Sequence, residues 1–432
     1  MIRMNMSATK RTFLLLVTLF CMWVSACSTS EEFTGYSYDP EGVTETHDRE
    51  INSQHKRTIG FSDDGVWISN EINGARASDV YRLDKYHYKV VIEPEISPIN
   101  NSAWYGFQVW SDEPADIKIE LEYQEGRQRY FPVISSDGGG TWQKINSDHF
   151  NRDSESGNGI ITLKLTDKPV LISAQEIFAA GHLQGWLEKM SGYSHIRVDT
   201  VGSSHLGRPL QQLTISDSSG ISPKGVLIVY NRQHPPEVPG YKTGLRFLEE
   251  LASDSEMARE FRNYFEVWAF PMLNPDGVDK GHWRTNAAGV DLNRDWEHFR
   301  QPETQAVRRA LLPLKNSAEK RVFYAIDFHS TGENVFYPIN RDIETFPNQF
   351  TYRWAQELDR RLPELNLRVE PFDVTSPIAK NWSYKTFGVD AVTFEVWDEL
   401  PRDKLQQLST ISAEIFMEMM IKEYKNEYAV EN

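Results

Sequence analysis

The sequence GVLIVY, residues 225–230, runs directly into NRQHPPE, residues 231–237. A short β-branched run that ends in a polar turn predicts a buried strand whose C-terminal end presents side chains. His234 and Glu237 lie three residues apart in this turn, on either side of two prolines. Because proline fixes φ and moves the residue before it out of the α region, we expect a rigid loop and not a helical turn. Such a loop can hold an imidazole and a carboxylate ready for a metal such as zinc.

Length and charge narrow the class of protein. The 432 residues predict two domains, or three, and the apolar fraction of 40% is ample for globular cores. The formal net charge of −16 provides no basic excess that could replace the counterions of a nucleic acid. We therefore expect no nucleic-acid partner, and an acidic surface that keeps a secreted protein in solution.

The N-terminus has the features of an export signal. A basic start precedes an apolar run over residues 13–24, which is too short for a comfortable membrane span. Residues 24–27, Val-Ser-Ala-Cys, resemble a bacterial lipobox. We therefore predict a lipoprotein signal peptide over residues 1–26 and lipidation of Cys27, with an ordinary signal peptide cut nearby as the alternative.

A lipid anchor would place the chain in the cell envelope. Ser28 follows Cys27, and the lack of aspartate there resembles the signal for sorting to the outer membrane of a Gram-negative host. We expect a protein anchored to that membrane and facing the periplasm. Cys21 and Cys27 are the only cysteines, so a chain cut before Cys27 has no disulfide. Cysteine is therefore neither a zinc ligand nor a nucleophile here.

Residues 58–172 have a β pattern. They follow a polar, acidic stretch over residues 27–57, which lacks apolar periodicity and predicts a flexible tether. Short β-forming runs then alternate with turn signals, a pattern typical of a small antiparallel β-sandwich. The clearest runs cover residues 66–68, 88–92, 104–110, 117–121 and 160–165. We expect the aromatic residues here in the core rather than on a carbohydrate-binding face.

Strands and helices alternate from residue 175 to residue 427. The predicted strands cover residues 213–215, 226–230, 265–270, 323–326 and 391–394, and the predicted helices cover 177–187, 243–251, 303–312, 350–362 and 404–424. This alternation predicts an α/β domain with a largely parallel or mixed sheet. In such sheets, ligands bind at the carboxyl ends of the strands.

Reactive side chains stand at the ends of further predicted strands. The pair His234 and Glu237 alone would equally fit a surface or capping role, so it needs a third ligand and a base elsewhere. His329 and Glu395 each lie at the end of a predicted strand. His234, Glu237 and His329 together supply the His₂Glu set of a hydrolytic zinc site, which keeps one position open for water. We therefore expect one zinc ion per chain.

The other groups of such a site also have candidates. Asp291 is a candidate to accept a hydrogen bond from the second ring nitrogen of a ligand histidine. Zinc lowers the pKa of its water to ~7, and Glu395, at the end of an apolar strand, is the candidate general base. Of Arg284 and Arg294, one can grip a substrate carboxylate and the other can stabilise an oxyanion.

These stretches, in this order, resemble the zinc carboxypeptidases of the carboxypeptidase A type over residues 177–424. The resemblance implies an α/β fold with a mixed, mostly parallel eight-stranded sheet flanked by helices, preceded here by the sandwich. It also implies the roles of the site residues. His234, Glu237 and His329 would be the zinc ligands, Arg284 would polarise the scissile carbonyl, Asn293 and Arg294 would grip the C-terminal carboxylate, and Glu395 would be the general base.

Two details point within that family. Residues 274–278, Asn-Pro-Asp-Gly-Val, and a sandwich before the catalytic domain look most like the cytosolic carboxypeptidase branch and its bacterial relatives, some of which trim acidic C-termini. Lys380 falls where the family's specificity pocket is usually built and would favour an acidic residue; a solvated loop lysine is the alternative. The family's mobile tyrosine has no clear counterpart, and we expect a packing role for Tyr384, the nearest tyrosine in sequence.

The leading hypothesis is a lipid-anchored metallocarboxypeptidase that removes C-terminal residues from peptides or proteins in the cell envelope. One alternative is a cell-wall peptide hydrolase, or an acyl-amino-acid amidohydrolase, that uses the same zinc site. A non-enzymatic binding lipoprotein is the other alternative. It is disfavoured because the sequence retains the ligands, the base and the arginines together.

Overall fold

The computed structural model describes residues 45–46, 49–217, 220–372 and 374–428. The predicted signal peptide, residues 1–26, and the predicted lipidation site Cys27 lie outside the described residues, as does most of the predicted tether. Within the described ranges, no helix is both long and apolar enough to cross a membrane.

Two β-sheets form the first part of the described chain. The six-stranded sheet has the order β1-β2-β5-β11-β7-β8, and the five-stranded sheet has the order β3-β4-β6-β10-β9. The strands are β1 (Thr58–Phe61), β2 (Val66–Ser69), β3 (Asp79–Asp84), β4 (His87–Ile92), β5 (Gly106–Ser111), β6 (Ala115–Tyr123), β7 (Val133–Ser135), β8 (Gln143–Lys144), β9 (Phe150–Arg152), β10 (Gly159–Leu165) and β11 (Val170–Ser173). A 3₁₀ turn, η1 (Ser147–His149), precedes β9.

The two sheets share one hydrophobic core. Val109 of β5 and Ile172 of β11 belong to the same buried cluster as Val90 of β4 and Ile119 of β6, which lie in the other sheet. Successive residues of a strand point to opposite faces, so each sheet contributes its alternate residues to this core. The described strand pairs are antiparallel except for β4 and β6, which pair in parallel. The predicted sandwich is thus present, with one parallel pair within it.

An eight-stranded mixed sheet follows, as the resemblance implied. Its order is β12-β13-β15-β14-β16-β19-β17-β18. The strands are β12 (Ile196–Ser203), β13 (Pro209–Ile215), β14 (Lys224–Asn231), β15 (Phe265–Phe270), β16 (Lys320–Thr331), β17 (Val335–Pro338), β18 (Arg368–Val369) and β19 (Asp390–Trp397). At its centre, β15, β14, β16 and β19 pair in parallel, so their carboxyl ends meet at one edge.

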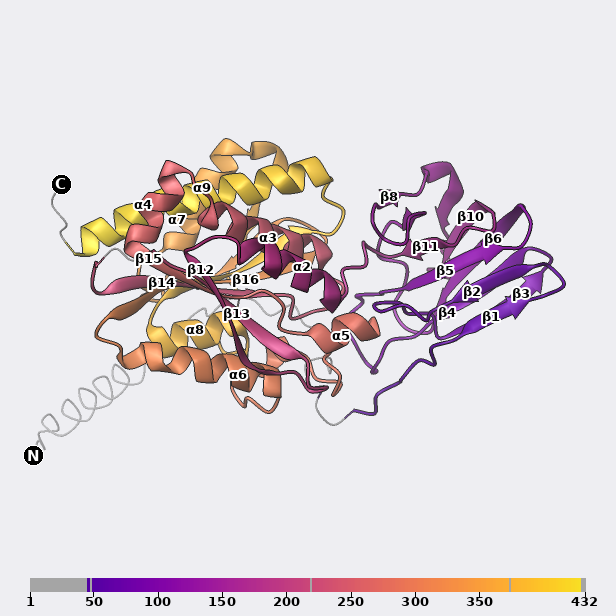
Figure 1. Ribbon diagram of the computed structural model, residues 1–432, viewed down its shortest axis with the longest axis horizontal. Helices are drawn as coiled ribbons and strands as arrows, with labels where there is room; N and C mark the ends of the chain where they lie inside the picture. The colour runs from indigo at the N-terminus through magenta and orange to yellow at the C-terminus, as the bar shows by residue number, and fades with distance from the viewer. Residues whose placement is uncertain (1–44, 47–48, 218–219, 373, 429–432) are drawn as a thin grey trace, which may run out of the picture. The chain divides into compact units, whose positions relative to one another are not determined.

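Helices cover both faces of this sheet. Figure 1 shows α3, α7 and α9 over one face and α6 and α8 over the other. The helices are α2 (Ala180–Met190), α3 (Val238–Ala252), α4 (Glu256–Tyr264), α5 (Pro275–Lys280), α6 (Pro302–Leu311), α7 (Phe350–Arg361), α8 (Ala379–Phe387) and α9 (Arg402–Glu427), with short 3₁₀ turns η2 (Leu292–Arg294), η3 (Leu312–Asn316) and η4 (Pro363–Leu365).

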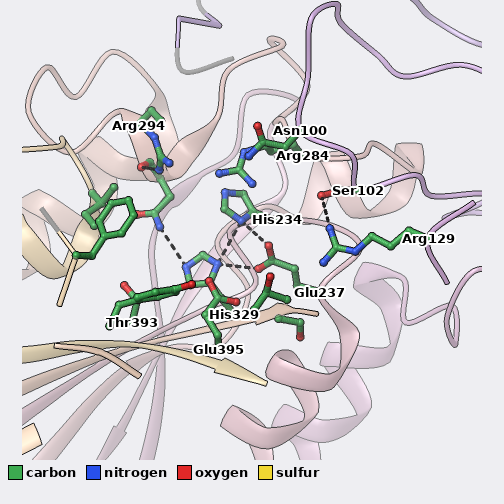
Figure 2. A pocket seen from close by; sticks show the side chains of 16 residues that line it. Asn100, Ser102, Arg129, His234, Glu237, Arg284, Arg294, His329, Thr393 and Glu395 are labelled. Atoms are coloured by element: carbon green, nitrogen blue, oxygen red, sulfur yellow. Dashed lines mark hydrogen bonds and ion pairs between the residues drawn. The ribbon is translucent and has the colours of Figure 1, made fainter. Parts of the chain in front are cut away.

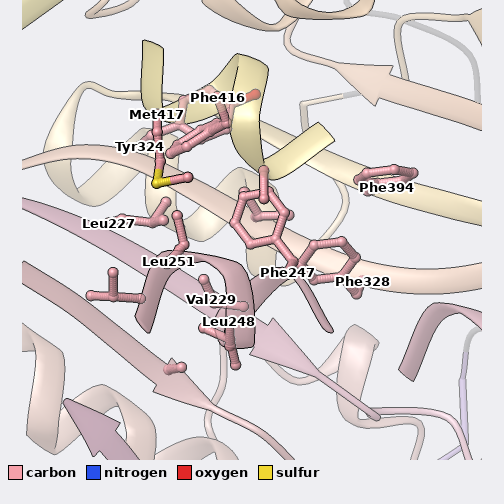
Figure 3. Close-up of a cluster of buried hydrophobic side chains, with 14 of the residues drawn as sticks. Leu227, Val229, Phe247, Leu248, Leu251, Tyr324, Phe328, Phe394, Phe416 and Met417 are labelled. Atoms are coloured by element: carbon pink, nitrogen blue, oxygen red, sulfur yellow. The ribbon is translucent and has the colours of Figure 1, made fainter. Parts of the chain in front are cut away.

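The decisive strand β14 is buried on both sides. Leu227 and Val229 point into the cluster beneath α3 and α9, where Phe247 and Phe416 pack (Figure 3). The alternate residues Val226, Ile228 and Tyr230 point into a second cluster on the opposite face. A strand with two apolar faces reads as a continuous hydrophobic run, which is why residues 225–230 lack polar alternation.

Several element boundaries differ from those predicted. The strand predicted over residues 265–270 matches β15, but α2 starts at Ala180 rather than 177. Its N-cap residue, Ala179, has no capping side chain, and Asp279 Oδ1, distant in sequence, accepts from the Ala180 amide instead. Helices α4 and α8 were not predicted although both carried signals. Ser255 caps α4 through the Ala258 amide, and Gly388 ends α8 in the left-handed region.

Helix α3 packs on β16 through a glycine. Gly240 donates its amide hydrogen to Ser330 Oγ at 2.7 Å, and a Cβ at this position would overlap the backbone of His329. Only a residue without a side chain permits this approach of helix and strand. The packing therefore fixes the position of His329 through its backbone.

We expect Gly240→Ala to lower the free energy of unfolding by about 1–3 kcal/mol, because overpacking forces the backbone to move. The displaced His329 should also lower the zinc content of the purified protein. Urea unfolding and elemental analysis measure the two effects. Gly181→Ala in α2 is the matched control, since its Cβ would meet no atom within 4 Å. Unchanged stability and zinc content in Gly240→Ala would contradict this account of the contact.

Candidate active site

The carboxyl ends of three adjacent parallel strands supply the candidate site. His234 and Glu237 follow β14, His329 lies near the end of β16, and Glu395 lies near the end of β19. In the register of β16 and β19, His329 stands directly opposite Glu395. Residues far apart in the sequence thus meet where open α/β sheets bind their ligands.

The turn after β14 is not helical, as the prolines predicted. Arg232 adopts a left-handed conformation with φ 56°, a costly geometry for a residue with a side chain. Two residues later, His234 starts a turn closed by the Glu237 amide, which donates to the His234 carbonyl at 3.4 Å. Glu237 then stands at the N-cap of α3. Strand, turn and helix together hold both side chains.

His234, Glu237 and His329 converge as a metal-binding triad. His234 Nδ1 lies 2.8 Å from Glu237 Oε1, and His329 Nδ1 lies 2.7 Å from Glu237 Oε2. The two Nδ1 atoms are 3.2 Å apart (Figure 2). Two nitrogens bound tetrahedrally at about 2.05 Å from zinc would lie about 3.3 Å apart. The three buried residues therefore fit a zinc ion in their identity and spacing.

Each histidine is oriented by a carboxylate at its other ring nitrogen. His234 Nε2 lies 2.9 Å from Asp291 Oδ1, and His329 Nε2 lies 2.9 Å from Asp327 Oδ2. Gln233 Nε2 in turn donates to both oxygens of Asp327. A proton held on Nε2 leaves the lone pair of Nδ1 for the metal. Asp291 thus occupies the position expected of it, whereas Asp327 was not predicted as an orienting residue.

Asn293 is packed against the triad. Its Oδ1 accepts a hydrogen bond from the Ala379 amide at 2.9 Å, which fixes the orientation of the side-chain amide. Its Nδ2 lies 3.2 Å from His329 Nε2. With a proton on Nε2, this last contact is not a hydrogen bond, so Nδ2 retains hydrogens that can be donated elsewhere.

Arg284 is tied to the triad through Asp291. Its Nε donates to Asp291 Oδ2 at 2.6 Å, while the other oxygen of Asp291 accepts from His234. The loop carrying Arg284 is held by Glu95, a buried carboxylate between β4 and β5. Glu95 accepts the amide hydrogens of Trp283, Arg284 and Thr285 at 2.7, 3.0 and 2.8 Å. The sandwich therefore helps to position an arginine of the site.

Glu395, the predicted general base, lies beside the triad. Its Oε2 is buried and accepts no hydrogen bond from the described residues. Burial, and then the negative charge of Glu237, raise the pKa of Glu395 to about 8. A carboxyl group that binds a proton this readily can take one and release it near neutral pH.

One cavity of about 210 Å³ contains these groups. It is lined by Asn100, Ser102, Arg129, His234, Glu237, Arg284, Asn293, Arg294, His329, Ser330, Thr331, Tyr337, Phe372, Ile378, Thr393 and Glu395. The predicted ligands, base, arginines and Asn293 are thus brought together, with Asp291 directly behind them. Sequence reasoning missed the three lining residues from the sandwich, since no motif marks them.

Lys380 is not brought to the wall of this cavity. It lies buried in α8, where its Nζ donates to the Pro338 carbonyl at 3.1 Å. The Nζ atom also lies 5.7 Å from the ring centre of Phe372, a residue that does line the cavity. Its predicted effect on specificity stays a prediction and would act from behind that ring. Tyr384 does not line the cavity, whereas Tyr337, which was not predicted, does.

Comparison with known proteins identifies the family of this chain. The sequence profile of the zinc carboxypeptidase family matches residues 183–410, more than half of the chain. The chain therefore belongs to the zinc carboxypeptidase family, a family of metallocarboxypeptidases that use zinc. The residues present at the triad fit that metal.

The curated relatives that the chain matches include cytosolic carboxypeptidases. The chain is 25% identical to cytosolic carboxypeptidase 6 of Caenorhabditis elegans over 313 residues, which covers 66% of this chain and 68% of that protein. It is 32% identical to cytosolic carboxypeptidase 6 of Mus musculus over 161 residues, or 35% of this chain and 30% of the mouse protein. The match thus spans less than a third of the mouse relative.

Solved structures share the fold over most of the chain. The metallo-carboxypeptidase from Burkholderia cenocepacia superposes with a TM-score of 0.67 at 17% identity, covering 84% of this chain and 99% of that one. The metallo-carboxypeptidase from Pseudomonas aeruginosa gives 0.67 at 19% identity, covering 83% and 99%. These likenesses support the fold, a mixed sheet flanked by helices.

Asp327→Asn should lower zinc affinity by about 10- to 100-fold, because loss of an orienting carboxylate weakens the basicity and alignment of His329. Competition with a chromogenic chelator measures the affinity. Asp359→Asn, on the exposed face of α7, is a matched control that should change nothing.

His329→Ala provides the lower limit in the same assay and should lose its zinc on dialysis, since one of three protein ligands is removed. If His329→Ala retained full zinc, a different third ligand would have to be sought. If Asp327→Asn bound zinc as tightly as the control, Asp327 would have no orienting role.

Proposed function

We propose that this chain is a zinc carboxypeptidase that hydrolyses the C-terminal peptide bond of peptides or proteins in the cell envelope. The observation that carries the proposal is the joint lining of one cavity by the metal-binding triad, a carboxyl group of raised pKa and two arginines. Family membership supports the reaction class. The substrates of the cytosolic relatives do not carry over, since the chain is exported in this proposal.

The metal and the general base have separate roles in the proposed reaction. Zinc, when bound, supplies a Lewis acid that makes water a better nucleophile and polarises a carbonyl oxygen. Glu395 takes the proton of the attacking water and delivers it to the nitrogen of the leaving residue. Its buried Oε2, without a hydrogen bond from the described residues, is suited to hold that proton in transit.

The arginines act on the substrate. The Arg284 guanidinium, fixed through its Nε by Asp291, can donate from its terminal nitrogens to the oxyanion that develops on the scissile carbonyl. Arg294 can grip the free α-carboxylate, and the Asn293 side-chain amide can donate to the same group. Together these contacts would select a peptide's last residue, because only that residue carries a carboxylate beside the scissile bond.

The location in the cell rests on the N-terminal sequence alone. The lipobox-like residues 24–27 and the serine after Cys27 support a lipid anchor at the outer membrane, facing the periplasm. Labelling of the full chain with a radioactive or clickable fatty acid tests this, with Cys27→Ala as the control. Equal labelling of both forms, or none of either, would remove the anchor from the proposal.

Glu395→Gln should keep zinc but lower kcat by about 10³-fold or more, because general-base help and proton delivery to the leaving amine are both lost. Turnover and zinc content are measured on the same preparation. Near-normal turnover would show that Glu395 is not the base.

A set of peptides that differ only in the C-terminal residue, assayed with and without a chelator, tests the reaction itself. We expect release of single C-terminal amino acids, abolished by the chelator and by C-terminal amidation of the substrate. Cleavage of amidated peptides, or of cell-wall peptides only, would favour the other hydrolases that use such a zinc site.

A further inference from the structure

Three side chains from the sandwich line the catalytic cavity, and the catalytic roles derived above leave them unused. Asn100 and Ser102 come from the connection between β4 and β5, and Arg129 comes from the connection between β6 and β7. Figure 2 shows Ser102 and Arg129 beyond Glu237, on the side of the metal-binding triad opposite to Arg294. We call these three side chains the sandwich wall. It faces the part of the cavity away from Arg294, the residue proposed to bind the substrate's carboxylate.

Arg129 is held rigidly in this wall. Its Nε and Nη2 donate to Asp398 Oδ2 at 2.9 and 2.7 Å. Its Nη1 donates to the Asn101 carbonyl at 3.0 Å and to Ser102 Oγ at 3.3 Å. Asp398 comes three residues after Glu395. The sandwich wall is thus fixed against the same strand end that carries the base.

A second anchor joins the same segments. The Phe131 amide donates to Glu399 Oε1 at 2.8 Å, and Lys144 Nζ donates to Glu399 Oε2 at 2.5 Å. Gln175 Nε2 donates to the Asp398 carbonyl at 2.8 Å. Ordering these side chains before a ligand arrives reduces the entropy that binding would otherwise cost.

The polar atoms of the wall retain hydrogen-bonding capacity. A guanidinium has five N–H groups, and the four contacts of Arg129 within the described residues leave one on Nη2. Ser102 Oγ accepts from Arg129, which leaves its own hydroxyl hydrogen to donate. Asn100 Oδ1 is buried and accepts no hydrogen bond from the described residues. The wall thus offers donors and an acceptor.

A trans peptide group presents its carbonyl acceptor and its N–H donor in opposite directions, so one peptide group meets the whole set where it passes between Asn100 on one side and Arg129 and Ser102 on the other. We propose that Arg129, Ser102 and Asn100 bind the peptide group that joins the two residues before the scissile bond. Its carbonyl accepts from Arg129 and Ser102, and its N–H donates to Asn100 Oδ1. The inference rests on the proposed function, which places the substrate's carboxylate at Arg294 and leads the rest of the peptide past the triad toward Arg129.

The wall selects substrate length rather than an acidic side chain. The charge of Arg129 is already balanced by Asp398 at 2.7 Å, so a second carboxylate gains little attraction there. A peptide group is present in every substrate of sufficient length, whatever its side chains. The sandwich therefore supplies a contact that a substrate without an upstream peptide group does not make.

Three synthetic substrates with the same C-terminal residue X, the best residue of the peptide screen, test this. Acetyl-alanyl-X has the upstream peptide group, propionyl-X lacks it, and acetyl-lactyl-X replaces its N–H with an ester oxygen. For the zinc-loaded full chain, kcat/KM should be about 10- to 100-fold higher for acetyl-alanyl-X than for propionyl-X, since two or three hydrogen bonds are added.

Substitution of each side chain should change kcat/KM on the three substrates in a different way. Ser102→Ala should lower the ratio of kcat/KM between acetyl-alanyl-X and propionyl-X by about 3- to 10-fold, as loss of one hydrogen bond implies. Asn100→Ala should lower kcat/KM for acetyl-alanyl-X more than for acetyl-lactyl-X, which has no N–H to donate. Arg129→Gln is combined with Asp398→Asn, so that no buried charge is left unpaired. Arg127→Gln, an exposed arginine in the same connection, is the matched control and should leave the ratio unchanged.

The proposal would be overturned if no variant changed the ratio of kcat/KM between acetyl-alanyl-X and propionyl-X. It would also be overturned if the variants lowered kcat/KM equally on all three substrates, because that result indicates a structural role. If the wild-type chain hydrolysed none of the substrates, the proposed function would fail separately. Calorimetric titration of zinc-loaded Glu395→Gln with acetyl-alanyl-X and propionyl-X would then decide. Tighter binding of acetyl-alanyl-X, lost in Ser102→Ala, supports the wall; equal binding, or none, overturns it.

Discussion

Parallel pairing of β14, β16 and β19 is the constraint on which the site depends. It brings the turn of His234 and Glu237, then His329, then Glu395, to one edge of the sheet, with the last two in direct register. Side chains alternate between faces along a strand, so a slip of one residue would carry Glu395 to the opposite face. The apolar residues buried on both sides of β14 fix that register. The stability of the core and the geometry of the metal-binding triad thus have one origin.

Buried charges are tolerated at this edge because each is compensated. Asp291 is shared between His234 and Arg284, and the positive charges beside it hold its pKa well below the usual range despite burial. Asp327 compensates His329 and is itself bonded by Gln233. A network in which each carboxylate has fixed partners can orient metal ligands without mobile side chains. Glu395 differs, since one of its oxygens has no hydrogen-bond partner among the described residues, and this favours a proton carrier.

The residues next to long apolar runs were the predictable part of the site. His234, His329 and Glu395 each follow a run that reads as a strand, and the order of these stretches carried the family resemblance. Asp327 could have been inferred, because it lies two residues before His329 and so on the same side of the strand. Arg129 could not: its partner Asp398 is 269 residues away, and neither lies in a recognisable motif. The fold followed from periodicity, whereas the start of α2, capped by the distant Asp279, the half-buried edge strand β12 and the two-residue edge strand β18 had weak signals.

The carboxylate of Glu95 limits which domains can stand before this catalytic domain. It accepts hydrogen bonds from consecutive backbone amides of the loop that carries Arg284, although it belongs to the sandwich. A catalytic half without this acceptor would leave these buried N–H groups unpaired, at a cost for each. Exchange of the sandwich for an unrelated module would therefore impair the loop even if the new joint folded. The sandwich and the catalytic domain should therefore evolve together. We expect an acidic residue at the position of Glu95 wherever both domains occur.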